Sequence, residues 1–245
     1  MNGPTKLEKK NIMIAAPSYD GRIEVGTSFC ITRAAIKEEH NCVVNTSETS
    51  SNTGGFNNLW CEALNDRKHG LTHFAMIHVD VVAEHGWLDK MIELMDKYCA
   101  DVMSAIIPIK SRAGFVSTAI DQSNGAAMGT KEHYDISALN LHEVHRMADK
   151  TFTDENILIN TGLMLVDMRK PWVEKMCFRF ENDIIKIGDE FKPFQVSEDW
   201  HFSREAKKLG AKLYATREIS VKHMGRAAYV NSQPWGTAGS EKEKL

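Results

Sequence analysis

Short runs of apolar residues alternate along the chain with segments whose apolar residues recur at helical spacing. The spacing is clearest after residue 55, where one helical face would consist of Phe56, Leu59, Trp60, Ala63 and Leu64. Strands are predicted at 11–16, 42–45, 72–79, 101–109, 157–159, 162–166, 212–214 and 219–223, and further helices at 25–39, at 87–98, from 171 and at 197–209. This alternation is typical of an α/β fold with a mainly parallel central sheet flanked by helices on both faces.

Two segments break the alternation. Residues 46–55 are small, polar and glycine-ended, which predicts a loop. Residues 110–155 contain three glycines and many polar residues, with a short helix predicted near 136–147, and long irregular insertions of this kind are usually functional. We expect one domain with a long insertion loop, divided as an N-terminal tail at 1–10, the α/β domain at 11–230 and a C-terminal tail at 231–245.

Composition narrows the class of protein only slightly. The 245 residues include 42% hydrophobic and 26% charged residues, as in an ordinary globular domain. The formal net charge of −3 argues against a broadly basic nucleic-acid coat, although a local basic groove is compatible with it. The five cysteines lie far apart without a Cys-x-x-Cys pair, which predicts neither a disulfide framework nor a zinc site and indicates a reducing compartment.

No targeting or membrane segment is evident. The first ten residues, MNGPTKLEKK, lack the apolar core of a signal peptide. No apolar run approaches the length of about 18 residues that a membrane span needs. We therefore expect a cytoplasmic protein.

The candidate chemistry lies where predicted strands end, because ligands of parallel sheets bind beyond the carboxyl ends of the strands. Asp80 follows the apolar strand 72–79, and a carboxylate there can hold a divalent cation that neutralises a departing diphosphate. His223 ends the last predicted strand and can complete such a metal shell as a neutral imidazole. Taken singly, each residue is also compatible with an ordinary packed or solvated side chain.

Two adjacent carboxylates, Glu198 and Asp199, follow Ser197 at the predicted start of a helix. Acidic residues at this position commonly cap the helix and interact with its dipole. The functional alternative is a general base that removes the proton from an acceptor hydroxyl during group transfer.

The order and surroundings of these signals resemble those of GT-A glycosyltransferases, which have a Rossmann-like α/β fold. The resemblance covers roughly residues 10–226, and its most specific part is Ser-Glu-Asp followed by His-Met-Gly. The matching segments are His78-Val79-Asp80, Gly86-Trp87-Leu88, Thr161-Gly162-Leu163-Met164-Leu165, Ser197-Glu198-Asp199 and His223-Met224-Gly225.

The resemblance implies a role for the metal-side residues. Asp80 matches the last Asp of the metal-binding triplet, and His223 matches the His that joins it in many members. His78 stands where the family more often has Asp, so it could bind a cation, hydrogen-bond a ribose hydroxyl or do neither. The implied cofactor is Mn²⁺ or Mg²⁺, which bridges the phosphates of a nucleotide-sugar donor, most commonly a UDP-sugar in this family.

The resemblance also implies catalytic and donor-binding residues. Asp199 matches the catalytic base, with Glu198 beside it, for a transfer that inverts the sugar carbon. The loop that holds the nucleotide base would be Pro17, Ser18 and Tyr19, and the turn lining the sugar and acceptor side would be Thr161 and Gly162. Asn57 falls near an Arg-Asn pair of the family, but Phe56 occupies the Arg position.

We expect the acceptor at the insertion 110–155. There Lys110, Arg112 and Lys131 could meet phosphates, and Phe115 or Tyr134 could stack on a base or sugar ring, although a solvated loop would contain similar residues.

The acceptor hypothesis comes from a second resemblance. The stretches Pro108-Ile109-Lys110, Ser117-Thr118-Ala119-Ile120 and Arg169-Lys170-Pro171-Trp172 resemble family 2-like glycosyltransferases encoded by bacterial viruses. This resemblance implies 5-hydroxymethylpyrimidines of viral DNA as an acceptor, in the host cytoplasm. Glycan, lipid-linked and protein acceptors stay open.

Two other classes of protein remain compatible with the sequence. A nucleotidyltransferase shares the open α/β sheet and a metal carboxylate, but would favour a basic, glycine-rich loop after the first strand, and 17–21 contains no cation before Arg22. An inactive nucleotide-sugar-binding domain is the other, because His78 replaces the more usual Asp.

Overall fold

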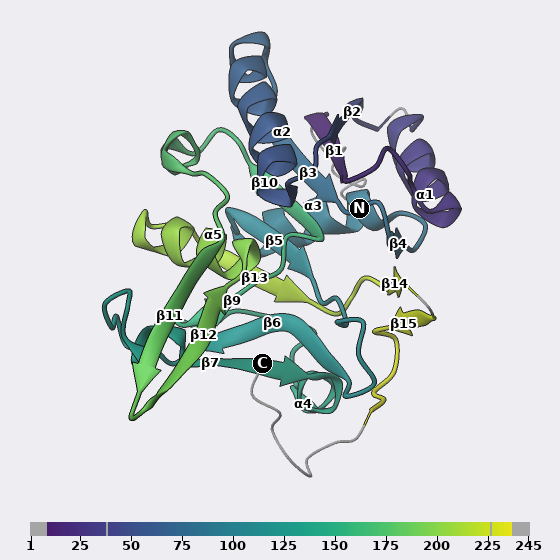
Figure 1. The fold of residues 1–245 in the computed structure, drawn as a ribbon. Helices are drawn as coiled ribbons and strands as arrows, with labels where there is room; N and C mark the ends of the chain where they lie inside the picture. The colour runs from purple at the N-terminus through teal and green to yellow at the C-terminus, as the bar shows by residue number, and fades with distance from the viewer. Residues whose placement is uncertain (1–8, 38, 226, 237–245) are drawn as a thin grey trace.

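The computed structural model describes residues 9–37, 39–225 and 227–236 (Figure 1). Most of the predicted N-terminal tail and the last nine residues of the predicted C-terminal tail therefore lie outside the described residues. The α-helices are α1 (Val25–Ala35), α2 (Asn52–Asp66), α3 (Trp87–Tyr98), α4 (Leu141–Arg146) and α5 (Glu198–Lys208), with 3-10 turns η1 (Arg67–His69), η2 (Lys131–Tyr134) and η3 (Pro171–Lys175).

The strands form one large sheet and three small ones. The seven-stranded central sheet has the order β2 (Asn41–Glu48), β1 (Asn11–Ser18), β3 (His73–Ile77), β10 (Leu163–Asp167), β5 (Val102–Ala105), β13 (Leu213–Thr216) and β8 (Thr151–Phe152). The small sheets contain β15 (Ala228–Val230), β14 (Val221–Met224) and β4 (Val81–Ala83); β7 (Ile136–Asn140), β6 (Phe115–Asp121) and β9 (Ile157–Leu158); and β11 (Glu181–Ile187) with β12 (Glu190–Val196).

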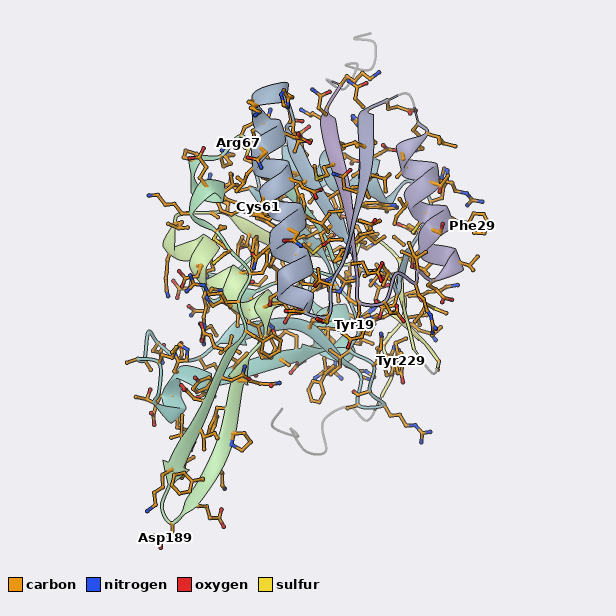
Figure 2. All side chains as sticks on the ribbon, turned by 45° about the horizontal axis from the view of Figure 1, so that its top comes forward. Tyr19, Phe29, Cys61, Arg67, Asp189 and Tyr229 are labelled. Carbon is orange, nitrogen blue, oxygen red and sulfur yellow. The ribbon has the colours of Figure 1, made fainter. Side chains whose placement is uncertain are left out.

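The central sheet is mainly parallel, as the sequence predicts. Strands β2, β1, β3, β5 and β13 run in one direction, and only β10 and β8 run against them. The carboxyl ends of β1 and β3 therefore lie at the same edge of the sheet. Figure 2 shows Tyr19, which directly follows β1, at this edge.

Helices cover both faces of the sheet because the strand side chains alternate between two cores. In β1, Met13 and Ala15 face the core beneath α2 and α5, whereas Ile12 and Ile14 face the core beneath α1 and α3. Strands β1, β3, β10 and β5 are buried on both sides, which accounts for their continuous apolar runs, whereas the edge strand β2 is largely exposed. The predicted fold class is confirmed.

The insertion at 110–155 contains more regular structure than the sequence predicts. Strands β6 and β7 pair antiparallel across it, with a register shift between Phe115 and Ala119. This irregularity and the glycine-containing turn between the strands obscure the period-two pattern. The predicted loop 46–55 is also shorter, because β2 extends to Glu48 and α2 begins at Asn52.

After Pro171, where the sequence predicts the start of a helix, the chain forms a short turn and then a two-stranded ribbon, β11–β12. The turn is the 3-10 turn η3. The ribbon reverses near Gly188, whose φ of +61° lies in the left-handed region that glycine adopts without strain. In Figure 2 its tip, marked by Asp189, projects away from the body of the protein. Among the described residues, no helix is both long and apolar enough to cross a membrane.

Candidate active site

Strand pairing brings Asp80 and His223 together, although they are far apart in the sequence. Asp80 lies in the turn between β3 and β4, and β14 pairs with β4 so that His223 lies opposite Val81. The backbone N–H of Met224 also donates to the carbonyl of Asp80 over 2.7 Å. The small sheet thus places one imidazole beside one carboxylate at the edge where β3 ends.

Two basic side chains contact the carboxylate of Asp80. His223 Nε2 lies 3.5 Å from Asp80 Oδ1, and the ammonium of Lys110 forms an ion pair with Oδ2. Burial alone would raise the pKa of Asp80, but its contacts with His223 and Lys110 outweigh burial and hold that pKa well below its usual value. Asp80 is therefore ionised throughout the physiological range.

The tautomer of His223 bears on whether this pair can hold a cation. Its Nδ1 lies 2.8 Å from the carbonyl oxygen of Pro108, which can only accept, so Nδ1 carries a proton. In the neutral ring Nε2 then presents a lone pair toward Asp80 Oδ1. Two acceptors at this separation need a shared proton or a cation. A metal-binding His typically donates its other N–H to a carbonyl in this way.

The donor set fits a divalent cation that takes its remaining ligands from a substrate. Within the described ranges, no cluster of three or more His, Cys, Asp and Glu side chains is placed to hold a metal by itself. Asp80 and His223 would provide two ligands. Mg²⁺ in particular is commonly held by one or two protein ligands plus substrate phosphates and water.

Asp199 is fixed at the start of α5 by the turn before β10. The backbone N–H of Thr161 donates to Asp199 Oδ1 over 3.1 Å, and the Thr161 hydroxyl donates to the same oxygen. Asn160 braces this turn, because its Oδ1 accepts from the N–H of Gly162 over 2.9 Å and its Nδ2 donates to the carbonyl of Ala105 over 2.6 Å. No described residue donates a hydrogen bond to Asp199 Oδ2.

Glu198 differs from its neighbour in its electrostatic environment. Burial, and then the negative charge of Asp199, raise the pKa of Glu198 to about 7. Ser197 occupies the predicted N-cap position but makes no side-chain capping hydrogen bond. The start of α5 thus carries one carboxylate held by hydrogen bonds and one that exchanges a proton near neutral pH.

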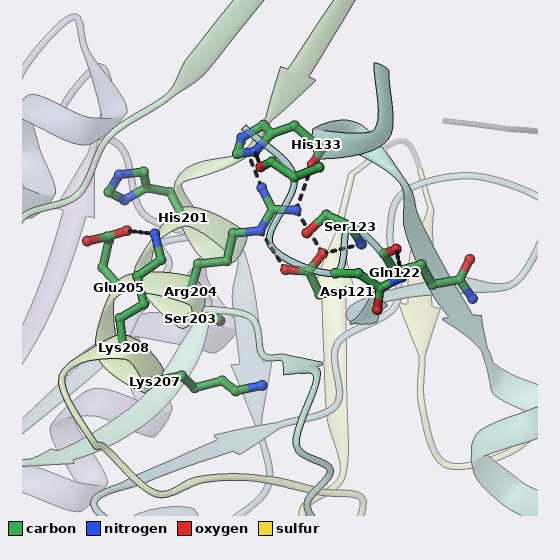
Figure 3. Close-up of polar contacts among 12 residues, drawn as sticks. Asp121, Gln122, Ser123, His133, His201, Ser203, Arg204, Glu205, Lys207 and Lys208 are labelled. Atoms are coloured by element: carbon green, nitrogen blue, oxygen red, sulfur yellow. Dashed lines mark hydrogen bonds and ion pairs between the residues drawn. The ribbon is translucent and has the colours of Figure 1, made fainter. Parts of the chain in front are cut away.

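A buried ion network anchors the rest of α5 (Figure 3). Arg204, only 8% exposed, donates to both oxygens of Asp121 over 2.7 and 2.9 Å and to the carbonyl of His133 over 2.8 Å. His133 Nε2 in turn lies 2.7 Å from Glu181 Oε2. Since Asp121 ends β6 and Glu181 begins β11, this network holds the helix that carries Asp199 against the insertion and the ribbon.

His78 lies between the carboxylates of Asp80 and Asp199. Burial lowers its pKa, against the opposing charges of Asp199 and then Asp80. Its backbone N–H donates to the carbonyl of Gly162 over 2.8 Å, and its ring packs 5.0 Å from that of Phe56. His78 Nε2 is buried without a hydrogen-bond partner among the described residues. His78 is thus a neutral ring that is close enough to both Asp80 and Asp199 to interact with their charges.

The predicted base-binding loop lies at the same edge of the sheet. Ser18 is the last residue of β1, and its hydroxyl donates to the carbonyl of Arg22 over 3.1 Å. Tyr19 follows with 65% of its surface exposed, so its ring is accessible to a ligand. Pro17 precedes both within β1.

Asn57 has a different environment. Its side-chain amide donates to the carbonyl of Phe178 over 2.9 Å and accepts from the Phe178 N–H over 2.8 Å. Both ends of the amide therefore fasten α2 to the segment before β11. The predicted contact with a nucleotide receives no support from this geometry and remains a prediction.

The most direct neighbour of Asp80 is a residue for which the sequence predicts another contact. The sequence predicts that Lys110 meets phosphates of an acceptor, but its ammonium pairs with Asp80. The contact joins two segments that follow different strands, and no local spacing indicates it. Position alone was a usable signal, because Lys110 follows the strand 101–109 at the same edge of the sheet.

Comparisons with known proteins give the fold alone. No protein-family model matches the sequence, and no curated protein matches it. The crystal structure of A197 from STIV is similar with a TM-score of 0.50 and 13% identity, covering 96% of this chain and 98% of that one. At this level of identity, the similarity concerns the fold of the two chains.

More distant structural similarity links the chain to S. aureus TarS 1–349. The TM-score is 0.43 with 12% identity, covering 85% of this chain and 58% of that one. The complex of TarS 1–349 with UDP-GlcNAc gives 0.43 and 10%, covering 85% and 56%. The chain therefore spans little more than half of the TarS structure.

Proposed function

We propose that this protein is a GT-A glycosyltransferase that moves a sugar from a nucleotide diphosphate sugar, a UDP-sugar, to an acceptor hydroxyl with inversion. The observation that carries the proposal is the convergence of Asp80, His223 and Asp199 around His78 at the carboxyl edge of a mainly parallel sheet. The resemblance of the same residues to the motifs of GT-A glycosyltransferases supports the same function.

Asp199 is the proposed general base. Thr161 holds Oδ1 in place, so that the second oxygen is left to accept the proton of the acceptor hydroxyl. A positioned base of this kind contributes about 10²- to 10⁴-fold to the rate. The deprotonated oxygen then attacks the anomeric carbon from the face opposite the departing diphosphate, which inverts that carbon.

Asp80 and His223 are the proposed metal ligands. Mn²⁺ or Mg²⁺ bound there would act as a Lewis acid on the departing diphosphate. Lys110, already paired with Asp80, adds a second positive charge beside the phosphates. The nucleotide base would lie against Pro17, Ser18 and Tyr19, of which Tyr19 offers an exposed ring.

The proposed acceptor is a 5-hydroxymethylpyrimidine of viral DNA, on the basis of the sequence resemblance to glycosyltransferases of bacterial viruses. The chain's own acceptor side consists of Asp199, Thr161 and Gly162. His78, with its unpartnered Nε2, is proposed to hydrogen-bond a hydroxyl of the donor once the neighbouring side chains adjust to it.

An inactive nucleotide-sugar-binding domain is the second candidate. The observation that favours it is the ion pair of Lys110 with Asp80, because an ammonium in this place neutralises the carboxylate that a metal would need. In this function the same cleft binds a nucleotide sugar and performs no transfer.

One assay separates these functions. The protein is incubated with a panel of nucleotide sugars, Mn²⁺ and hydroxymethylated DNA, and the released nucleotide and the mass of the DNA are measured. Release of nucleoside diphosphate with a hexose mass gain is expected. Release of sugar 1-phosphate would instead indicate nucleotidyl transfer, because that is the group that leaves when the nucleotide of the donor is transferred, and donor binding without any release would identify the inactive domain.

A further inference from the structure

A groove opens beside the proposed active site, with a volume of about 860 Å³. This lies within the usual range for ligand sites. Its lining residues come from the start of the insertion and from the segment around β15, and they are Lys110, Arg112, Ala227, Ala228, Tyr229, Val230, Gln233 and Trp235. Neither the metal pair nor the base Asp199 lies in this lining.

Lys110 connects the groove to the active site. It lines the groove and also forms the ion pair with Asp80. Its aliphatic stem runs along the end of β14, because a Cβ added to Gly225 would lie 3.1 Å from Lys110 Cδ. A ligand in the groove therefore lies directly next to the carboxylate proposed to hold the metal.

Two aromatic rings form a braced wall of the groove. The rings of Tyr229 and Trp235 are 5.7 Å apart, and Trp235 Nε1 donates to the carbonyl of Val230 over 2.6 Å. The backbone of Trp235 packs against Gly114, where an added Cβ would approach the Trp235 carbonyl oxygen to 2.1 Å. Only glycine fits there, so the aromatic segment is held tightly against the insertion.

The charges in the groove favour an anionic ligand. Among the described residues, the lining contains two cations and no carboxylate. Arg112 is exposed and forms no hydrogen bond or ion pair with any described residue. A site for a neutral sugar chain would need several acceptors for hydroxyl groups, and within the described part of the lining only Gln233 offers a side-chain amide. A positive groove with aromatic side chains is instead the usual arrangement for single-stranded nucleic acid.

Of the two aromatic residues expected to stack on the acceptor, Phe115 and Tyr134, the second is engaged elsewhere. The Tyr134 hydroxyl donates to Asp183, and the ring packs 5.3 Å from Phe194 of the ribbon. Tyr134 thus packs against the end of the β11–β12 ribbon that joins the body of the protein. The groove offers the better stacking surface, since Tyr229 and Trp235 are only half-buried.

We propose that this groove binds a single-stranded segment of nucleic acid, with a base stacked on Tyr229 and Trp235 and a phosphate paired with Arg112. The inference rests on the proposed function, for which it supplies the acceptor-binding surface. A strand held there presents its neighbouring nucleotide to the cleft of Asp80 and Asp199.

The test is binding of a fluorescent single-stranded oligothymidylate of about eight nucleotides, measured by anisotropy at several salt concentrations. Tyr229→Leu is expected to weaken binding at least about fivefold, because stacking on an aromatic ring contributes that much per base. Arg112→Gln is expected to reduce the slope of log affinity against log salt by about 0.7, the value for one phosphate contact of a single strand.

Lys68→Gln is the matched control, because Lys68 is an exposed cation of η1 without a described partner. Figure 2 shows neighbouring Arg67 at the upper left of the molecule, well apart from Tyr229 at the right. This variant is expected to bind the strand like the wild type. Thermal unfolding of each variant at an unchanged midpoint establishes that the fold is intact.

Two outcomes would overturn the groove assignment. One is unchanged binding by folded Tyr229→Leu and Arg112→Gln. The other is equal competition by inorganic polyphosphate or a sugar-phosphate polymer at the same phosphate concentration, since neither carries a base to stack. Release of nucleoside diphosphate from the donor is measured in parallel, so that failure of the groove and failure of glycosyl transfer are distinguished.

Discussion

The two acidic positions of the proposed active site have opposite electrostatic surroundings. Asp80 contacts an imidazole and an ammonium, which hold its pKa well below the usual value. Glu198 is buried beside another carboxylate, and its pKa rises to about 7. Groups whose environments push their pKa values apart commonly divide the work of one reaction. Asp80 keeps a permanent charge on the side proposed for phosphates and metal, and Glu198, next to the proposed base Asp199, exchanges protons.

The largest expected effect on turnover comes from replacing the proposed base, Asp199. Asp199→Asn keeps the shape of the side chain and removes its basicity, so we expect turnover to fall about 10²- to 10⁴-fold. Donor affinity should stay unchanged, because the proposed donor contacts lie on the Asp80 side. Released nucleoside diphosphate and calorimetric donor binding measure the two quantities.

The control for this prediction is Glu205→Gln on the same helix. Glu205 forms an exposed ion pair with Lys208 at 2.6 Å and lies away from the turn at Thr161. Full activity of this variant excludes a general effect on α5. Wild-type turnover in Asp199→Asn would remove Asp199 from the role of base.

The next largest effect, on donor affinity, comes from replacing the proposed metal ligand Asp80. Asp80→Asn leaves His223 and Lys110 without their shared anion. Because hydrogen bonds to charged groups are worth about 1.5–3 kcal/mol, we expect Mn²⁺-dependent donor affinity to fall about 10- to 100-fold. Calorimetry with and without Mn²⁺ measures the change, and equal affinities in the two proteins would contradict the metal assignment.

The raised pKa of Glu198 predicts a pH dependence of stability. Its ordinary pKa is 4.5 and its value in the folded protein is about 7. Folding therefore favours the protonated form, so the contribution of Glu198 to stability is present below pH 4.5 and is lost as the pH rises through 7. Thermal unfolding midpoints of the wild type should fall over this window relative to those of Glu198→Gln. Parallel profiles for the two proteins would contradict the assigned pKa.

The smallest effect concerns the competition between Lys110 and a metal for Asp80. The ion pair is about one-third exposed, and such pairs contribute about 0.2–1 kcal/mol. Lys110→Met should therefore raise Mn²⁺ affinity about two- to fivefold in the absence of donor. Titration calorimetry of Mn²⁺ measures this shift. A weaker metal affinity in Lys110→Met would show that Lys110 assists the metal site.

The sequence predicts the central sheet well because strands buried on both faces leave long apolar runs, such as residues 11–16 and 72–79. It predicts the ribbon 181–196 poorly, because apolar residues fall on both of its faces and much of it is solvent-exposed. The pattern of apolar residues predicts an element only where that element is buried, and little of the projecting ribbon is buried.

The residues of the candidate site also differ in whether the sequence alone predicts their position. The placement of Asp80 and Asp199 at ends of elements is visible in the sequence, because strand ends and helix starts have local signals. The contact of Lys110 with Asp80 and the paired amide of Asn57 depend on how distant segments pack. Such contacts leave no local spacing, and they become visible only in the folded chain.

The most direct measurement is anomalous scattering from crystals grown with Mn²⁺ and UDP. We expect a manganese peak in contact with Asp80 and His223, the diphosphate on the same ion, and the carboxylate of Asp199 facing the space beyond the terminal phosphate. A nucleotide bound at a different edge of the sheet, with Asp80 still paired only to Lys110 and His223, would contradict this expectation.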